Sequence, residues 1–445
     1  MFYGYEVADI CGGQLYGNKN AYAANVSTDS RTTEENDLFV ALCGENFDGN
    51  NFVPTAFNKG AEICVVSRDV LVPHGKCAVL VKNTGAALLR LAAYHRQKYK
   101  IPVIAITGSV GKTTTKELVA SGLESELNIL KTSGNFNNEI GLPKTLFRLS
   151  GEHKAAVLEM GMSSLGEISR LSKTACPDIA VITNIGLSHI ENLISVENIL
   201  KAKLEILDGL SENGILLLNA DDKNLRQLPT LSRKTMYYGI ENSCDFRGVK
   251  INEYTVKYNN TDIILPMEGK HNQLNAMAAV AVGSIMGLSA AQIAKGIKEN
   301  YKPDGKRQTI VSHPLGFTVM CDFYNASPTA VAASLEVLGK KEGRKIAVLG
   351  DMLELGDFSE KCHIETGELA AKNKVDVLFG YGDESLFTVK SAKKAGVGSC
   401  AHFSSQEELA KELTKILRAG DFLLIKGSRA MKMENIYEKI MGWQI

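Results

Sequence analysis

The sequence predicts an α/β protein whose parallel sheets are covered by helices on both faces. Seven runs rich in Val, Ile and Leu show little alternation of apolar and polar residues, which is typical of strands buried on both faces. Stretches with the spacing of amphipathic helices separate these runs, as in repeated βα units. The runs lie at 103–107, 155–160, 179–183, 215–219, 346–350, 377–382 and 422–427. The fold class is therefore α/β, and we expect more than one sheet.

The chain length predicts about three domains. Its 445 residues correspond to three units of ~150 residues each. Residues 1–97 carry shorter candidate strands and form the expected N-terminal domain. The segment Lys98–Pro102 leads into the first strong strand, and a second break at 300–307 brings Pro, Gly and charge after an Ala-rich helix. We therefore expect a central domain over 98–304 and a C-terminal domain over 305–445. The shorter strands are expected at 37–42, 62–67 and 77–82.

Composition and charge exclude several classes of protein. The 50 basic residues balance 50 acidic ones, so the chain lacks the basic excess expected of a protein that works on nucleic acid. The N-terminus lacks the basic start and apolar core of a secretory signal, and the longest apolar stretch, 276–288, is too short to span a bilayer. Nine cysteines without a C-x-x-C pair argue against a cysteine metal site and favour a reducing compartment. We therefore expect a cytoplasmic protein without nucleic-acid or membrane partners.

The sharpest motif is a glycine loop between the strand at 103–107 and a predicted helix. Backbone N–H groups of such a loop and of the helix N-terminus form a cradle for phosphate. Lys112 is expected to reach the β- and γ-phosphates of ATP, and the Thr113 hydroxyl to bind Mg²⁺. The spacing departs from the common G-x-x-x-x-G-K-[ST] pattern, and a chance glycine turn before a helix is the alternative. The predicted nucleotide-binding residues of the loop are Gly108, Ser109, Val110, Gly111, Lys112, Thr113 and Thr114.

Three further side chains could act beside this loop, but the residue pattern leaves their roles open. Glu159 ends the strand at 155–160, where it could hold Mg²⁺ or cap a helix. His189 follows the strand at 179–183, and because imidazole is an uncommon Mg²⁺ ligand it is more typical of a loop histidine. Lys203 has the pattern of a solvated helix lysine. Since ligands gather at the carboxyl ends of parallel strands, Glu159 and His189 are expected at one edge of the sheet.

Polar turns in the second half of the chain form another group of candidates. Asn272 and Asn275 are three residues apart and share one face near the start of a predicted helix. Arg307 follows the second domain break, and Asp322 and Tyr324 follow a strand-like run. Each turn taken alone could merely cap the next helix. Several of them on one rim favour a binding site. Similar turns lie at 350–356 and 426–429.

Together these segments resemble the Mur ligases, the ATP-dependent amide-forming enzymes of peptidoglycan synthesis. The resemblance covers essentially the whole chain, and the motifs occur in the family's order. They read TGSVGKTTTKE, GNFNNEIGLP, EMGMSSLGEI, TNIGLSHIEN, KAKLEI, GKHNQLNAMAA, DFYNASPTA, LGDMLELG and KGSRAMKME. The first two and LGDMLELG look most like the family member that joins D-alanyl-D-alanine to UDP-N-acetylmuramoyl-tripeptide.

The resemblance implies a three-domain architecture. The first domain is expected to recognise the UDP-muramoyl end of the substrate. The second is a P-loop ATPase-like parallel sheet, and the third is a Rossmann-like domain that closes over the site. Ser30 and Arg31 match the family's UDP-side motif. Asn137 and Asn138 are expected to face the peptide end.

The resemblance also implies roles around the nucleotide. The family's metal ligands match Thr113, Glu159 and His189, and a lysine that carries a carbamate matches Lys203. A carbamate turns an amine into an anionic oxygen ligand, which suits a second hard cation, so two Mg²⁺ ions are expected. The family's adenine, phosphate and ribose contacts match Asn272, Asn275, Arg307, Asp322 and Tyr324. The side chains expected to act in catalysis are Lys112, Lys203, His189 and Arg307.

One departure from the family pattern concerns the phosphate-contacting cation. Many members read Pro-x-x-Gly-Arg before the third domain, whereas this chain has one more residue, Lys306, between Gly305 and Arg307. Either Arg307 keeps the role in a longer loop, or Lys306 shares it. The sequence does not decide between these two alternatives.

The implied reaction uses ATP to activate a carboxylate as an acyl phosphate, which the amine of D-alanyl-D-alanine then attacks. One alternative is a sister ligase or folylpolyglutamate synthase, which would use a different acceptor. Another is a P-loop switch ATPase, whose phosphate release would not depend on any acceptor. We expect a monomer with small-molecule substrates. The third residue of the stem peptide (meso-diaminopimelate or lysine) stays open, as does an open or closed arrangement of the domains.

Overall fold

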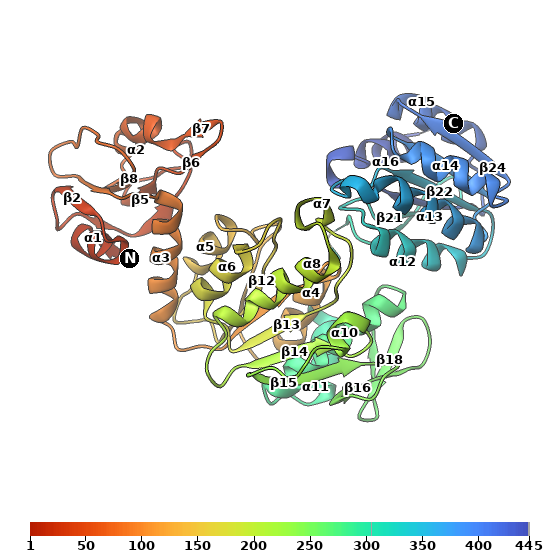
Figure 1. The fold of residues 1–445 in the computed structure, drawn as a ribbon, viewed down its shortest axis with the longest axis horizontal. Helices are drawn as coiled ribbons and strands as arrows, with labels where there is room; N and C mark the ends of the chain where they lie inside the picture. Colours follow the sequence, from red (N-terminus) through yellow and green to blue (C-terminus); the bar gives the residue numbers. More distant parts are fainter. Residues whose placement is uncertain (304, 444–445) are drawn as a thin grey trace.

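The computed structural model describes residues 1–303 and 305–443 (Figure 1). The chain forms three parts, each built around its own sheet, and the central part lies between the other two (Figure 1). The boundary expected at 304/305 includes residue 304, which lies outside the described residues. The α/β fold class with more than one parallel sheet is confirmed.

The N-terminal part contains a five-stranded sheet in the order β2-β9-β8-β5-β4, parallel except for β2. The three strands expected here are confirmed as β5, β8 and β9. The sheet consists of β2 (Gln14–Gly17), β4 (Asn25–Ser27), β5 (Asp37–Val40), β8 (Ile63–Val66) and β9 (Cys77–Leu80). The helices are α1 (Gly4–Cys11), η1 (Gly49–Phe52), α2 (Val53–Asn58) and α3 (Thr84–Gln97). Two small ribbons pair β1 (Phe2–Tyr3) with β3 (Tyr22–Ala23) and β6 (Cys43–Gly44) with β7 (Phe47–Asp48).

The central part is built on a seven-stranded parallel sheet in the order β11-β12-β10-β13-β14-β15-β16. Its strands are β10 (Val103–Thr107), β11 (Ile129–Lys131), β12 (Ala155–Glu159), β13 (Ile179–Ile182), β14 (Ile215–Asn219), β15 (Lys234–Gly239) and β16 (Phe246–Arg247). An antiparallel sheet adds β17 (Val249–Lys250), β18 (Thr255–Tyr258) and β19 (Thr261–Ile264). The helices are α4 (Lys112–Leu123), α5 (Gly141–Leu146), α6 (Glu167–Ala175), α7 (Ile190–Leu193), α8 (Val196–Leu204), η2 (Glu205–Asp208), α9 (Lys223–Arg226), α10 (Lys270–Ile285) and α11 (Ala290–Asn300).

Burial on both faces explains why the central strands lack an alternating pattern. In β10, Val103 and Ala105 belong to one hydrophobic core, together with residues of α5, α6 and α8. Ile104 and Ile106 belong to another core, formed with α4, α10 and α11. Each face of the strand therefore needs apolar side chains. The apolar stretch at 276–288 falls largely within α10, and among the described residues no helix is both long and apolar enough to cross a bilayer.

The C-terminal part contains a six-stranded sheet in the order β20-β21-β25-β22-β23-β24, parallel except for the edge strand β20. Its strands are β20 (Thr309–Ser312), β21 (Thr318–Cys321), β22 (Lys345–Gly350), β23 (Val377–Tyr381), β24 (Ser399–Phe403) and β25 (Phe422–Lys426). The helices are α12 (Pro328–Gly339), η3 (Gly356–Phe358), α13 (Ser359–Lys372), α14 (Ser385–Lys394), α15 (Gln406–Ile416), η4 (Arg429–Met431) and α16 (Glu434–Met441).

Helix α3 attaches the N-terminal part firmly to the central part (Figure 1). The buried Arg96 donates to the backbone oxygens of Ala175, Tyr99 and Ile101. His95 is also buried, and its Nε2 lies 3.3 Å from the Leu149 oxygen. Because buried polar groups need partners, these bonds fix the C-terminal end of the helix on the central sheet.

Candidate active site

A cleft of about 430 Å³ lies between the central and C-terminal parts. It opens at the carboxyl ends of β10 and β12, where ligands gather in parallel α/β sheets. Its lining residues range from Ser109 in the central part to Lys426 in the C-terminal part, so both parts form its walls. The predicted residues that line it are Ser109, Val110, Gly111, Lys112, Thr113, Thr114, Asn137, Asn138, Glu159, His189, Asn272, Asn275, Arg307, Asp322 and Tyr324.

The glycine loop has a shape that only glycine permits at Gly108. Its φ is +149°, and an added Cβ would lie 1.9 Å from the Thr183 Oγ1. Val110 is held from both sides: its N–H donates to Asn184 Oδ1 at 2.9 Å, and its oxygen accepts from Thr183 Oγ1 at 2.7 Å. Thr183 and Asn184, which directly follow β13, therefore brace the loop that follows β10.

Lys112 begins helix α4 directly after the loop. Its Nζ donates to the Gly108 oxygen at 2.8 Å, so the ammonium folds over the loop. Burial lowers the pKa of Lys112; the negative charge of Glu159 opposes this effect, and the positive charge of Arg307 adds to it. A cation, a helix N-terminus and a glycine loop at one place form a site for an anion.

Glu159 presents an unsatisfied carboxylate oxygen to this site. It is the last residue of β12 and only 2% exposed. Its Oε1 accepts from Asn137 Nδ2 at 2.8 Å, while Oε2 has no hydrogen-bond partner within the described chain. A buried carboxylate oxygen without a partner is costly unless a cation binds it. The alternative role as a helix cap is therefore excluded, because α6 begins eight residues later at Glu167.

His189 lies where the central and C-terminal parts meet. It precedes α7 with a φ of +62°, and its Nδ1 is 2.5 Å from Glu354 Oε2. The contact with His189 lowers the pKa of Glu354 against the opposing effect of burial. The loop LGDMLELG thus reaches the site through Glu354. Across residues 1–303 and 305–443, no three or more His, Cys, Asp or Glu side chains group closely enough to hold a metal ion.

Lys203 is not the solvated lysine that the residue pattern favoured. It lies on α8 and is only 1% exposed, because the helix packs this side against the sheet rather than against solvent. Burial lowers the pKa of Lys203 well below its ordinary value, and the charge of Lys112 lowers it further. The electrostatic influence of Lys112 places this amine near the phosphate loop, although Lys203 does not line the cleft.

The asparagines at the start of α10 do not cap it. The N-cap is Gly269, and no side chain makes a cap hydrogen bond. Asn272 Nδ2 instead donates to the oxygen of Glu268 at 2.7 Å and to Gln308 Oε1 at 2.6 Å. Asn275 Oδ1 accepts from Thr115 Oγ1 at 3.1 Å, which ties α10 to the helix after the phosphate loop.

The C-terminal part contributes a stacked cation and a buried ion pair. The guanidinium carbon of Arg307 lies 3.7 Å from the centroid of the Tyr324 ring, a cation–π contact. Asp322 accepts from Lys426 Nζ at 2.6 Å and from Ser334 Oγ at 2.5 Å. Asp322 is therefore engaged inside its own domain as well as lining the cleft.

The two residues expected to hold the UDP end lie outside the lining of the cleft. Neither Ser30 nor Arg31 lines it, and both belong to the N-terminal part. Ser30 is buried. Arg31 is exposed and pairs with Asp29 at 2.7 Å, which lowers the pKa of that carboxyl to about 2.

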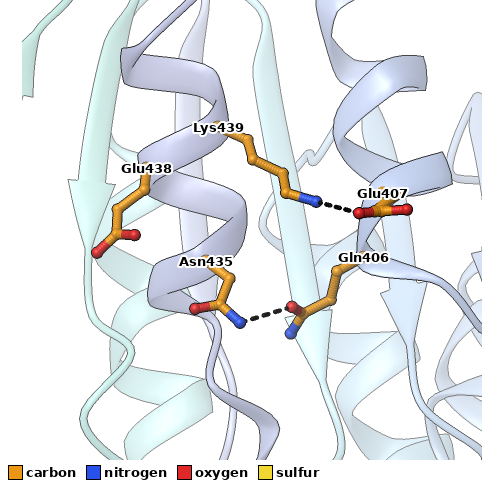
Figure 2. A pocket seen from close by; sticks show the side chains of 5 residues that line it. All are labelled: Gln406, Glu407, Asn435, Glu438 and Lys439. Carbon is orange, nitrogen blue, oxygen red and sulfur yellow. Dashed lines mark hydrogen bonds and ion pairs between the residues drawn. The ribbon is translucent and has the colours of Figure 1, made fainter.

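A second hollow lies on the surface between α15 and α16 (Figure 2). Two pairs of its polar groups bond to each other: Asn435 Nδ2 donates to Gln406 Oε1, and Lys439 pairs with Glu407, each at 3.1 Å (Figure 2). None of the predicted residues lines it. The chemistry of the molecule therefore concentrates in the first cleft.

Several lining residues were not named as site candidates from the sequence, among them His271 and Asn184, and Lys426 was included only within the polar turn at 426–429. Lys426 ends the apolar strand β25, and a lysine closing a buried strand is a signal that could have been used. His271 precedes Asn272, and burial lowers its pKa. Asn184 holds the loop backbone, but nothing in its local sequence indicates a partner 74 residues away.

Comparisons with known proteins agree with this geometry. Three family descriptions match in chain order: "Mur ligase family, catalytic domain" over 23–99, "Mur ligase middle domain" over 106–283 and "Mur ligase, glutamate ligase domain" over 306–429. The chain is 39% identical to the UDP-N-acetylmuramoyl-tripeptide–D-alanyl-D-alanine ligase of Bacillus subtilis (strain 168), covering 94% of this chain and 93% of the relative. It is 35% identical to the ligase of the same name from Escherichia coli (strain K12), covering 97% and 96%.

Solved structures agree as well. Crystal structure I of MurF from Acinetobacter baumannii superposes with a TM-score of 0.90 at 30% identity, covering 99% of each chain. MurF ligase from Thermotoga maritima in complex with ADP superposes with a TM-score of 0.84 at 29% identity, covering 95% of this chain and 97% of the other. The family descriptions, the full-length identity and the fold all agree, and the chain belongs to the Mur ligase family.

Proposed function

We propose that the protein is an ATP-dependent ligase that adds D-alanyl-D-alanine to UDP-N-acetylmuramoyl-tripeptide in peptidoglycan precursor synthesis. One observation carries the proposal. A single cleft combines a phosphate loop, a buried acid with a free oxygen and side chains of the C-terminal part. Relatives that bear this activity in their names match the chain over nearly its full length, which supports the choice of substrates.

The phosphate loop and the residues opposite it suit ATP. The backbone of 108–114 and the ammonium of Lys112 would hold the phosphates. Asn272 and Asn275 lie beside the loop on α10, and Asp322 and Tyr324 face them from the C-terminal part. We assign these four to the adenine and ribose. Arg307, stacked on Tyr324, is assigned to the phosphates, where Lys306 could share its role.

The site fits a hard cation such as Mg²⁺. The partnerless Glu159 Oε2, the Thr113 hydroxyl and His189 would hold it, and an oxygen-rich donor set is what Mg²⁺ prefers. The bound cation would neutralise charge on the phosphates. The side chains alone provide a sparse set of ligands, and this favours an additional anionic group and coordination by ATP itself.

Lys203 suits the role of that additional group. A carbamate forms when an unprotonated amine attacks CO₂ and releases a proton, so a buried amine with a strongly lowered pKa is favourable. The product is an oxygen anion beside the phosphate loop, which supports a second Mg²⁺. We therefore propose a carbamylated Lys203 and two cations.

The reaction brings like charges together. A substrate carboxylate attacks the γ-phosphate, ADP leaves and an acyl phosphate forms. The amine of the dipeptide then attacks the acyl carbon, and phosphate and a proton leave as the amide forms. At an effective dielectric of about 20, two unit charges about 4 Å apart repel by about 4 kcal/mol. Lys112 and Arg307 provide positive charge where the charges meet. Closure of the C-terminal part, whose Glu354 already touches His189, would exclude water from the acyl phosphate.

The length of the substrate explains the use of three domains. We propose an N-terminal domain over 1–97, a central domain over 98–304 and a C-terminal domain over 305–445. Ser30 and Arg31 would hold the UDP end, and Asn137 and Asn138 the peptide end. Binding energy at the remote UDP end can then position the reacting carboxylate.

The decisive assay measures phosphate release from ATP in the presence of UDP-muramoyl-tripeptide with different acceptors. D-Alanyl-D-alanine should stimulate release far more than D-alanine, L-lysine or glutamate. Glutamate as the best acceptor, with a folate in place of the UDP-sugar, would indicate a folylpolyglutamate synthase. Release that ignores every acceptor would indicate a switch ATPase.

The carbamate has its own test. Lys203→Ala should lose most ligase activity, and a small added carboxylate should restore part of it by replacing the missing oxygen anion. Bicarbonate should raise wild-type activity but leave Lys203→Ala unchanged. Full activity of Lys203→Ala in bicarbonate-free buffer would contradict the assignment.

A further inference from the structure

Lys116 is a buried cation that the proposed reaction does not use. It lies one turn into α4, is 1% exposed and does not line the cleft. Its Nζ donates to the backbone oxygen of Thr132 at 2.7 Å and pairs with Glu117 Oε1 at 2.6 Å. Burying an ammonium is costly, so a methionine would fill the space at lower cost if packing were the only need.

Thr132 connects Lys116 to the acid of the site. It follows β11 directly, and its N–H donates to the Val157 oxygen in β12 at 3.1 Å. Its Oγ1 accepts from the backbone N–H of Glu159 at 3.0 Å. The segment that starts at Thr132 also leads to Asn137, whose Nδ2 donates to Glu159 Oε1. The contact to the Glu159 backbone therefore depends directly on where Thr132 lies.

We infer that Lys116 is a positioning residue, which fixes the Glu159 carboxylate relative to the phosphate loop through Thr132. The helix that begins at Lys112 thereby carries two cations with different tasks: Lys112 faces the phosphates, and Lys116 holds the edge of the sheet that supplies the metal-binding acid. The inference rests on the proposed role of Glu159 as a Mg²⁺ ligand. Residues behind the ligands of a metal typically change metal affinity by 10–100-fold when replaced.

The test is the affinity for ATP, measured by calorimetry with Mg²⁺ and again with EDTA. Lys116→Met should weaken binding about tenfold with Mg²⁺ and leave binding in EDTA within about twofold. Lys131→Met is the matched control: Lys131 pairs with the same Glu117 at 3.0 Å and directly precedes Thr132, but the carbonyl oxygen of Thr132 accepts from Lys116 and not from the Lys131 ammonium. It should match the wild type under both conditions.

Two further variants make the outcome decisive. Thr132→Val removes the hydroxyl that accepts from Glu159 and should reproduce the Mg²⁺-specific loss, and the double variant with Lys116→Met should lose less than the sum of the two. If Lys116→Met does not fold, Thr132→Val decides the test. Equal losses with and without Mg²⁺ in these variants would overturn the positioning role. Glu159→Gln separates the two proposals: if it retains the full Mg²⁺ effect, the metal assignment itself fails.

Discussion

The buried pair between Lys426 and Asp322 leads to a quantitative prediction about stability. Their side chains are 3% and 12% exposed, and Lys426 Nζ also donates to the oxygen of Asn325 at 3.1 Å. Lys426→Met would remove the ammonium and leave the carboxylate buried. Removal of one partner of a buried pair costs about 3–5 kcal/mol. Because Ser334 still donates to Asp322, we expect the lower end, about 3 kcal/mol.

This loss should be visible by calorimetry. For a unit of roughly 150 residues, 1 kcal/mol shifts the melting temperature by about 2–4 °C, so the transition of the C-terminal part should fall by about 6–12 °C. Lys439→Met is the control, because Lys439 pairs with Glu407 on the surface, where the side chains are 42% and 84% exposed. Exposed pairs contribute about 0–1 kcal/mol, so this variant should melt within about 4 °C of the wild type.

A compensating variant checks the cause. Lys426→Met combined with Asp322→Leu removes both charges and should recover most of the lost stability, because a buried pair can be replaced by apolar groups at little cost. The reasoning is refuted if Lys426→Met melts no lower than Lys439→Met. It is also refuted if the double variant is less stable than Lys426→Met alone.

Three further predictions concern the loop, the catalytic cation and pH. Gly108→Ala should lower ATP affinity at least about 100-fold by calorimetry, because the new Cβ meets Thr183 Oγ1 at 1.9 Å and distorts the phosphate cradle. Lys112→Ala should lower the ligase rate by about 10²–10³ or more while circular dichroism stays unchanged; a wild-type rate in the folded variant would remove the phosphate-loop assignment. Burial lowers the pKa of His95, so below about pH 6.5 His95 binds a proton in the unfolded chain but not in the folded one. The free energy of unfolding should therefore decrease as the pH is lowered, by up to about 1.4 kcal/mol per pH unit. His95→Gln should flatten this slope in urea titrations between pH 7 and pH 5; an unchanged slope would contradict it.

The strands of the sheets could be predicted because each is recognisable from its own run of apolar residues. The runs at 103–107 and 215–219 coincide with β10 and β14, since burial on both faces favours apolar side chains at successive positions. The strand order could not be predicted in this way. β10 lies between β12 and β13, and a run of apolar residues does not specify which neighbour it pairs with.

The parts of the site that consist of a local sequence motif could be predicted. The contacts between residues that lie far apart in the sequence could not. The glycine loop implied an anion cradle, and the structure places it at the cleft. Lys203 looked solvated because a helix lysine ordinarily is, whereas packing of the helix buries it. Asp322 was recognisable as a candidate, but its partner Lys426 lies 104 residues later and only the fold brings them together.

The bracing of the loop by β13 has a consequence for the chain during its synthesis. Helix α4 is complete once residue 123 has emerged, but Val110 acquires its partner Asn184 only 74 residues after its own appearance. At translation rates of about 5–20 residues per second, that interval lasts about 4–15 s. A nascent chain that ends before β13 therefore carries every residue of the glycine loop without its shape. We therefore expect the loop to acquire its shape only after Asn184 has joined it.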